Sequence, residues 1–340
     1  MRHILQTGQK HCYNQNGVEL PCMGTGQDAA FGRGLIWPDP RFTTQDKVVQ
    51  DHLSGLFWTR SVNIGGFPCT WNEAFLQVAE LNRERYGGYE DWRLPNRNEL
   101  HSLLCYGSKN PALPPGHPFV DIFLGWYWSS TTAAINPAYA WAVQLEGARM
   151  FYGRKDQAYL FWPVRGKGKG VLAATGQQRC YDSQGLPIAC AQTGQDGDIH
   201  LGRPWPEPRF TPQDDLVIDH LTGLVWAAQA NATAGPIPWE QAYVAVQEWN
   251  ERHAHLSIDW YLPTINELAS LVDCGQHSPA LPSNHPFWDL QEGYWAATTS
   301  AFEPDWAWVL YTDKGALGVG YKPDSTFWVW PVGVQRKNEE

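Results

Sequence analysis

Cysteines are the residues of this chain whose types and spacing most clearly point to chemistry. There are seven, and Cys12 and Cys22 recur with the same spacing as Cys180 and Cys190. Matched spacing within turn-rich segments is typical of local disulfides, so the sequence predicts the bridges Cys12–Cys22 and Cys180–Cys190. Structural zinc sites usually place two cysteines about two to four residues apart, and no cysteine pair in this chain does so.

The remaining three cysteines differ between the two halves of the chain. Cys69 and Cys105 occur only in the first half, where the matching positions of the second half hold Ile237 and Asp273. Since a bridge confined to one half would show this pattern, a third disulfide, Cys69–Cys105, is predicted. Cys274 is left over and is interpreted as a free buried thiol. Disulfides persist in oxidising compartments, so an extracellular or cell-surface location is expected, with the periplasm as the alternative.

Two Asp-His pairs do not extend to a recognisable catalytic motif. Asp51-His52 and Asp219-His220 each precede a turn of the form L-[S/T]-G-L. An aspartate at such a position is expected to accept hydrogen bonds from backbone amides of the turn. No P-loop, GxSxG, HExxH or EF-hand spacing occurs in a supporting context. No catalytic residue and no metal ligand are therefore predicted, and among cofactors only Ca²⁺ is left open.

An internal repeat organises the elements that position these residues. The stretch DWRLPNRNEL (Asp91–Leu100) returns as DWYLPTINEL (Asp259–Leu268), 168 positions later. Other strings return at nearly the same offset: TGQKHCYNQNGVELPC as TGQQRCYDSQGLPIAC, WPDPRFT as WPEPRFT, DHLSGLFW as DHLTGLVW, and YWSSTT as YWAATT. The sequence therefore predicts two copies of one domain, 1–165 and 171–340, joined by a Gly/Lys linker at 166–170.

Each copy is expected to be an α+β domain with two helices followed by an antiparallel β meander. In the first copy, apolar residues at helical spacing and a Thr70–Glu73 capping box predict a helix over 71–85. Asn96 and Glu99 predict the cap of a second short helix near Arg97. Four segments that alternate apolar and polar residues predict the strands of the meander; they are 127–132, 139–145, 149–153 and 159–165.

The repeated DWRLP stretch is interpreted as a structural joint. Pro95 cannot lie within a helix and forces Leu94 into an extended conformation, so the chain turns there into the second helix. Arg93 could pair with Glu99, but its counterpart in the second copy is Tyr261. Such a pair is therefore not essential to the fold, and Arg93 stays a candidate for ligand binding.

The chain has 19 tryptophans, and the repeat separates them into two groups. Seven pairs match between the copies and are interpreted as core residues; they are Trp37/Trp205, Trp58/Trp226, Trp71/Trp239, Trp92/Trp260, Trp128/Trp295, Trp141/Trp308 and Trp162/Trp330. Five have no counterpart and are candidates for the surface, for an inter-domain contact or for a ligand platform; they are Trp126, Trp249, Trp288, Trp306 and Trp328.

The candidate ligand site lies in the segment 123–137. Recognition is expected on loops where the copies differ, and the second copy replaces both serines of YWSSTT by alanine. Aromatic faces with neighbouring hydroxyl and amide groups suit a neutral sugar. The predicted ligand-binding residues are Trp126, Tyr127, Ser129, Ser130, Asn136 and Arg93. The alternative is that this segment is a strand packed in the core.

Composition excludes several classes of partner. The formal net charge is −10, and lysines and arginines form no cluster of the kind that binds phosphate, so neither nucleic acid nor an anionic membrane is expected as a partner. No apolar run approaches the roughly 18 residues of a membrane-spanning helix, so no membrane insertion is expected.

The strings DHLSGLFW, DWRLPNRNEL, YWSSTT and FWPVRG resemble the C-terminal domain family of the collagen-like lectin adhesins, the Lcl C-terminal domain. The resemblance covers nearly all of both copies. It implies two tandem C-type-lectin-like domains, a fold akin to that of formylglycine-generating enzymes. It also implies export, a surface location and, for adhesin members, glycan binding, but it supplies no catalytic set.

Three functions remain as expectations. The first is a non-enzymatic secreted or cell-surface protein that recognises a glycan or a surface protein through its loops. The alternative is a self-assembling structural subunit of an extracellular coat, filament or adhesin. The third is an enzyme of the formylglycine-generating kind, which would need a redox-active cysteine pair or a metal-binding thiolate near the loops.

Overall fold

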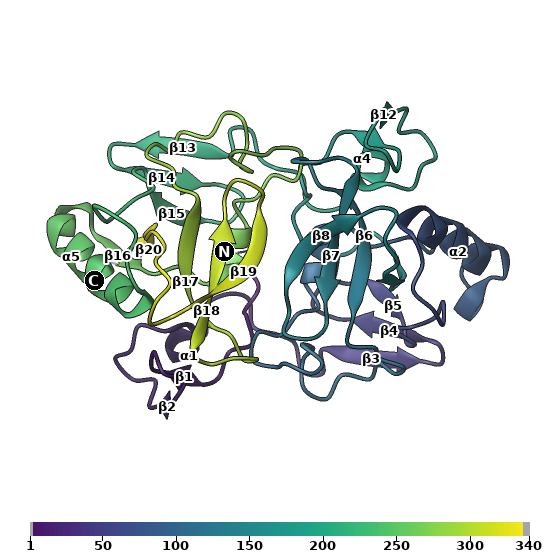
Figure 1. The fold of residues 1–340 in the computed structure, drawn as a ribbon, viewed down its shortest axis with the longest axis horizontal. Helices are drawn as coiled ribbons and strands as arrows, with labels where there is room; N and C mark the ends of the chain where they lie inside the picture. Colours follow the sequence, from purple (N-terminus) through teal and green to yellow (C-terminus); the bar gives the residue numbers. More distant parts are fainter. Residues whose placement is uncertain (1–2, 336–340) are drawn as a thin grey trace. The chain divides into compact units, whose positions relative to one another are not determined.

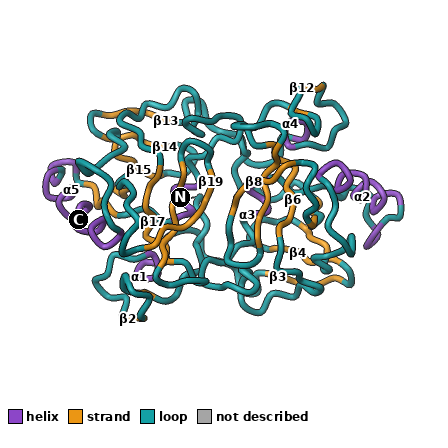
Figure 2. The backbone as a smooth tube through the Cα atoms, viewed as in Figure 1, coloured by secondary structure: helices purple, strands orange, loops and turns teal. Residues whose placement is uncertain are grey.

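The computed structural model describes residues 3–335, and these form an α+β fold rich in short strands (Figure 1). Figure 2 shows that loops and turns connect most of the strands and helices. The expected α+β class is confirmed. For reference, 3–35 is called the first lead-in, 36–170 the first core, 171–204 the second lead-in and 205–335 the second core.

The chain forms two compact units that do not coincide with the two copies of the repeat. Unit 1 comprises Met1–Leu35, Trp205–Val272 and Leu281–Glu340, and unit 2 comprises Ile36–Pro204 and Asp273–Ala280. Each unit therefore joins the lead-in of one copy to the core of the other. The ranges 1–165 and 171–340 describe the repeat of the sequence. In the compact units, the first lead-in packs on the second core and the second lead-in packs on the first core.

Unit 2 contains two mainly antiparallel sheet regions and one main helix. The first region has the order β10-β5-β4-β3, formed by β3 (Phe42–Gln45), β4 (Val48–Asp51), β5 (Phe57–Thr59) and β10 (Val164–Arg165). The second has the order β8-β7-β6-β9, formed by β6 (Trp126–Thr132), β7 (Tyr139–Gln144), β8 (Met150–Arg154) and β9 (Leu160–Phe161). Strand β9 runs parallel to β6, and the other pairs are antiparallel.

The helices of the first core start where their caps predict. Helix α2 (Trp71–Arg83) begins at the Thr70–Glu73 capping box, and α3 (Arg97–His101) begins at the Asn96–Glu99 box. A short 3₁₀ turn, η1 (Tyr86–Gly88), follows α2. The expectation that helices precede all strands was wrong, because β3, β4 and β5 come before α2. The expected strand 159–165 is also two strands in different sheet regions, since Trp162-Pro163 interrupts it.

The second core in unit 1 repeats this arrangement. One sheet has the order β13-β14-β15-β20-β16, formed by β13 (Phe210–Gln213), β14 (Leu216–Asp219), β15 (Leu224–Ala227), β16 (Ile258–Tyr261) and β20 (Val332–Gln335). Strands β17 (Gly293–Thr299), β18 (Trp306–Tyr311) and β19 (Ala316–Tyr321) form a meander. Its helices are α5 (Trp239–Arg252), η2 (Ala254–Leu256) and α6 (Ile265–Ala269).

Each lead-in is a small disulfide-closed hairpin followed by one helical turn. The first contains β1 (Cys12–Tyr13), β2 (Glu19–Leu20) and α1 (Asp28–Phe31), and the second contains β11 (Cys180–Tyr181), β12 (Pro187–Ile188) and α4 (Asp196–Ile199). The predicted disulfides Cys12–Cys22 and Cys180–Cys190 are both present.

The predicted third disulfide is wrong. Cys69 and Cys105 are buried and form no disulfide, because their segments are fixed to different parts of the core. The amide of Cys69 donates to the carbonyl of Tyr159, whereas that of Cys105 donates to the carbonyl of Ala112. Cys274 is a free buried thiol, as predicted.

The matched tryptophans form the cores, as expected. Twelve of the 14 are buried, and only Trp37 and Trp205 are partly exposed. Trp58 packs against Trp162 with ring centroids 5.3 Å apart, and Trp226 packs against Trp330 at the same distance. This agreement shows that the repeat preserves the packing as well as the sequence. Of the five unmatched tryptophans, Trp249 is buried, Trp288 is 54% exposed and the other three are partly buried.

Candidate functional site

A buried aspartate joins each lead-in to the core of its unit. In unit 2, Thr175 of the lead-in and Thr131 of β6 donate hydrogen bonds of 2.6 and 2.7 Å to one carboxylate oxygen of Asp196. Asp196 opens α4, so its carboxylate lies at the junction of both segments. Burial raises the pKa of Asp196 to about 6, although the two hydroxyl donors act in the opposite direction. The carboxylate thus fixes the lead-in while itself being poorly solvated.

Unit 1 builds the same junction from the matching residues. Thr7 of the first lead-in and Thr298 of β17 each donate a 2.7 Å hydrogen bond to Asp28. Burial raises the pKa of Asp28 to about 6 as well. Helix α1, which Asp28 opens, lies beside β17 (Figure 1). The junction is therefore a repeated feature of the fold.

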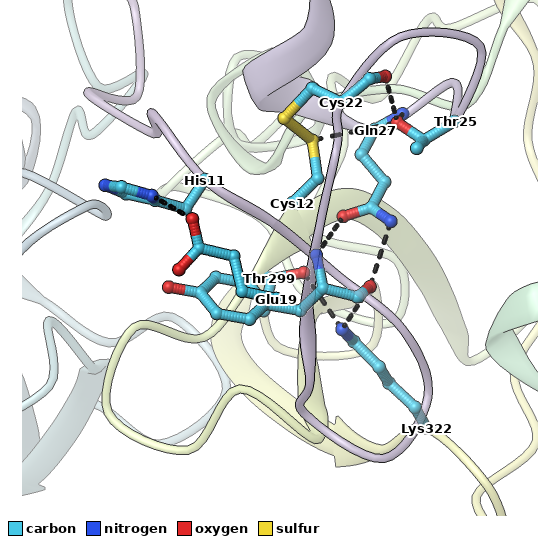
Figure 3. The surroundings of a disulfide bond; sticks show 9 residues. His11, Cys12, Glu19, Cys22, Thr25, Gln27, Thr299 and Lys322 are labelled. Carbon is cyan, nitrogen blue, oxygen red and sulfur yellow. Dashed lines mark hydrogen bonds and ion pairs between the residues drawn. A yellow bond between two sulfur atoms is a disulfide. The ribbon is translucent and has the colours of Figure 1, made fainter.

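A buried lysine fixes each lead-in from the other side. In unit 1, Lys322 lies 4.0 Å from the ring centroid of Trp239 and donates to the carbonyl of Pro304 and the hydroxyl of Thr299. Its ammonium also lies 3.5 Å from the carbonyl oxygen of Tyr13 in the first lead-in. Figure 3 shows the Lys322 side chain pointing toward the disulfide-closed hairpin.

Lys155 has the same role in unit 2. It lies 4.0 Å from the ring centroid of Trp71 and donates to the carbonyls of Tyr181 and Asp182 at 3.3 and 3.1 Å. Burial lowers the pKa of Lys155, and that of Lys322, to about 7. Both lysines are 1% exposed or less, so they do not face solvent.

A glutamine pins the second lead-in to the end of β6. Gln177 accepts a 2.6 Å hydrogen bond from the amide of Thr132 and donates to the carbonyls of Thr132 and Cys274 at 3.1 and 3.2 Å. Its side chain is buried and makes all three of these hydrogen bonds within unit 2. Gln9 in unit 1 donates to the carbonyl of Thr299 in the matching way.

A polar pocket of about 440 Å³ opens above this junction in unit 2. Gln177 contributes a buried side chain to its lining, and Tyr181, which is partly exposed, also lines it. The exposed lining side chains are Gln178, Arg179, Gln276 and His277, and the rest of the lining is Ala134, Gly176 and Gly275. The two glycines bring backbone close together, since a Cβ on Gly275 would lie 3.0 Å from the carbonyl oxygen of Gly176. No acidic side chain lines the pocket.

The structure places half of the predicted ligand-binding residues in the core. Tyr127, Ser129 and Ser130 are at most 2% exposed. Their hydroxyls already donate to backbone carbonyls, those of Phe123, Trp141 and Pro95. These three residues therefore do not form a surface platform, and the alternative of a packed strand describes them.

The other three predicted residues have three different environments. Trp126 is partly buried and stacks on Tyr159, with ring centroids 6.0 Å apart. Asn136 is exposed in the turn between β6 and β7, two residues beyond Ala134 of the pocket. Arg93 is paired with Glu99 through two hydrogen bonds of 2.6 and 2.7 Å. The pair of Arg93 and Glu99 that the sequence suggested is thus present.

The Asp-His pairs serve the turns that follow them. One oxygen of Asp51 accepts from the amide of Leu53 and the other from the hydroxyl of Ser54. Asp219 accepts in the same way from Leu221 and Thr222. The expectation of turn-stabilising aspartates is confirmed. Across residues 3–335, no group of three or more His, Cys, Asp or Glu side chains could hold a metal ion.

A family comparison accounts for the cores. The model of the Lcl C-terminal domain matches residues 47–165 and again 215–333. The chain belongs to the Lcl C-terminal domain family. Both matches begin inside the cores, so the lead-ins lie outside the matched Lcl C-terminal domains. None of the curated proteins compared with the chain matches it.

Sequence reasoning missed the buried aspartates, the buried lysines and the pocket. One signal was present, because Asp28 and Asp196 both follow TGQ, and Lys155 and Lys322 occupy matching positions of the repeat. A charged residue kept in both copies beside apolar strands could have marked these junctions.

Within 3–335, no helix has the length and apolarity that crossing a membrane requires.

Proposed function

We propose that the protein is a non-enzymatic, secreted or cell-surface binding protein that recognises a glycan or another polar surface component through the pocket in unit 2. The pocket is the observation that carries this proposal. Its volume of about 440 Å³ lies in the range of small-molecule sites. Amide, guanidinium and imidazole groups beside the Tyr181 ring supply the hydrogen bonds and the aromatic face that suit a sugar.

Compartment and family support the same proposal. Two disulfides favour an oxidising compartment, and membership of the Lcl C-terminal domain family favours an adhesin-like surface protein. A C-type-lectin-like fold for each core is part of this proposal and rests on the family assignment.

The thiols support a non-enzymatic role. An enzyme of the formylglycine-generating kind needs reactive cysteines, and thiolates are the reactive form. Cys69, Cys105 and Cys274 are all buried, and burial raises the pKa of Cys69 to about 11 and that of Cys274 to about 12. These two thiols are protonated at neutral pH and closed to solvent.

A glycan array with the full chain, followed by calorimetric titration of the best ligand, tests the proposal. Replacing Gln178 and Arg179 by Ala removes exposed pocket side chains, and affinity should fall about tenfold or more, which corresponds to about 1.4 kcal/mol. Lys10 and His11 occupy the matching positions of the first lead-in, so their replacement by Ala is the control and should leave affinity unchanged. Equal losses in both variants, or an array without any bound glycan, would contradict a glycan site in this pocket.

A further inference from the structure

The two lead-ins are held by the same set of contacts, each on a core that belongs to the other copy. One such contact is the aspartate bridged by two threonines, described above for both units. Another is an asparagine near the start of the short helix, which donates to the lead-in backbone. Asn266 donates to the carbonyl of Leu5 at 2.9 Å, and Asn98 donates to the carbonyl of Ala173 at 3.0 Å.

None of these contacts depends on which chain supplies the lead-in. They are side-chain and backbone hydrogen bonds between segments far apart in sequence, such as Asn266 and Leu5, which are separated by 261 positions. The lead-in is also closed on itself by its disulfide, Cys12–Cys22 in the first copy. The hairpin over residues 12–22 therefore stays closed whether or not the lead-in is docked on a core.

We propose that a second copy of this chain can supply the first lead-in to the second core, so that chains are linked to one another by exchange. The contacts are the same within one chain and between two chains. The ratio of docking within one chain to docking between two chains is then set by effective concentration, which for a tethered segment is on the order of millimolar. Dilute chains fill their own second core, and chains crowded together fill the cores of their neighbours.

The first lead-in offers a chemical reporter of this exchange. The backbone amide of Gln15 donates a 3.1 Å hydrogen bond to the carboxylate of Glu240 at the start of α5. Gln15→Lys therefore places an amine within reach of that carboxylate, and a carbodiimide can couple the two into an amide. The matching pair in the repeat is Ser183 and Asn72, which has no carboxylate, so Ser183→Lys is the control for the reagent.

The test mixes two full-length chains that cannot form this crosslink on their own. One carries Gln15→Lys together with Glu240→Gln, and the other, labelled with ¹⁵N, keeps Gln15 and Glu240. After incubation and coupling, the peptide that joins residues 15 and 240 contains one light and one heavy half only if the lead-in has moved between chains. Its yield should rise about tenfold for a tenfold increase in chain concentration below the millimolar range.

Two results would overturn the proposal. The first is a yield of the light–heavy crosslinked peptide that, at every concentration, is no higher than the background from the same mixture made with Ser183→Lys in place of Gln15→Lys. This result counts if a single chain with Gln15→Lys and native Glu240 couples fully. The second is no coupling even in that single chain, which would mean that the first lead-in does not occupy the second core. Circular dichroism checks that each variant folds, and Asn16→Lys replaces Gln15→Lys if the latter does not.

Discussion

Thr298 donates a hydrogen bond of 2.7 Å to Asp28 across 270 positions of sequence. Thr131 makes the matching bond to Asp196 across 65 positions. Both bonds join a lead-in to a core that the order of the repeat would assign to the other copy. The bonds between these threonines and aspartates define how the chain is assembled from its parts.

Replacement of Asp28 by Asn should flatten the dependence of stability on pH. Burial raises the pKa of Asp28 from 3.8 to about 6, so the folded protein holds this proton more tightly than the unfolded chain does. The stability from the proton is fully present below pH 3.8 and is lost as pH rises through 6. The free energy of unfolding of the wild type should therefore fall by about 2 kcal/mol more than that of Asp28→Asn between pH 4 and 7.

Urea denaturation at a series of pH values measures this difference. Asp324→Asn, at an exposed position of the same unit, is the control and should follow the wild type. Parallel curves for the wild type and Asp28→Asn would show that Asp28 ionises in the folded protein as it does in the unfolded chain.

Replacement of Arg93 by Tyr should be tolerated better than replacement by Ala. Arg93 binds Glu99 through two hydrogen bonds, and in the second copy Tyr261 donates a 2.7 Å hydrogen bond to the matching Glu267. Arg93→Ala leaves a buried carboxylate without this partner and should cost about 3 kcal/mol. Arg93→Tyr should recover at least half of that loss in urea denaturation. Equal losses for both variants would show that the tyrosine of the second copy does not replace the arginine.

Removal of either disulfide should destabilise the unit that contains it. Both bridges span 10 residues, so the loss should be similar, roughly 2–3 kcal/mol for each pair replaced by Ala. Chemical denaturation of the Cys12/Cys22 and Cys180/Cys190 variants measures it. Peptide mass spectrometry without reducing agent checks the wild-type pairing. Free thiols at these four positions would remove the argument for an oxidising compartment.

Local signals in the sequence predicted local structure correctly. The starts of α2 and α3 follow from the capping boxes at Thr70 and Asn96, because a cap is made by residues three positions apart. The disulfides of the lead-ins follow from spacing for the same reason. The repeat identified the tryptophans of the core, since packing residues recur when a domain is copied.

Features that depend on distant contacts could not be predicted in this way. Ser129 and Ser130 were predicted to contact a ligand because the second copy replaces both by alanine, but they are buried with backbone carbonyls as partners. The prediction of a Cys69–Cys105 bridge was wrong, because the occurrence of two cysteines in only one copy says nothing about the distance between their thiols. A constant repeat offset also does not reveal which lead-in docks on which core, since both pairings produce the same sequence.

Amide hydrogen exchange in two lysine variants tests most directly whether each lead-in docks on the core of the other copy. At pH 6, below their pKa values of about 7, Lys322 and Lys155 are mostly charged, and each hydrogen bond to a charged group contributes about 1.5–3 kcal/mol. Lys322→Met should speed amide exchange roughly tenfold or more in the first lead-in, Cys12–Phe31, and leave the second lead-in unchanged. Lys155→Met should do the reverse, loosening Cys180–Ile199 alone. If Lys322→Met instead loosens the second lead-in, which precedes it in the same copy of the repeat, each lead-in docks on its own core and the account is contradicted.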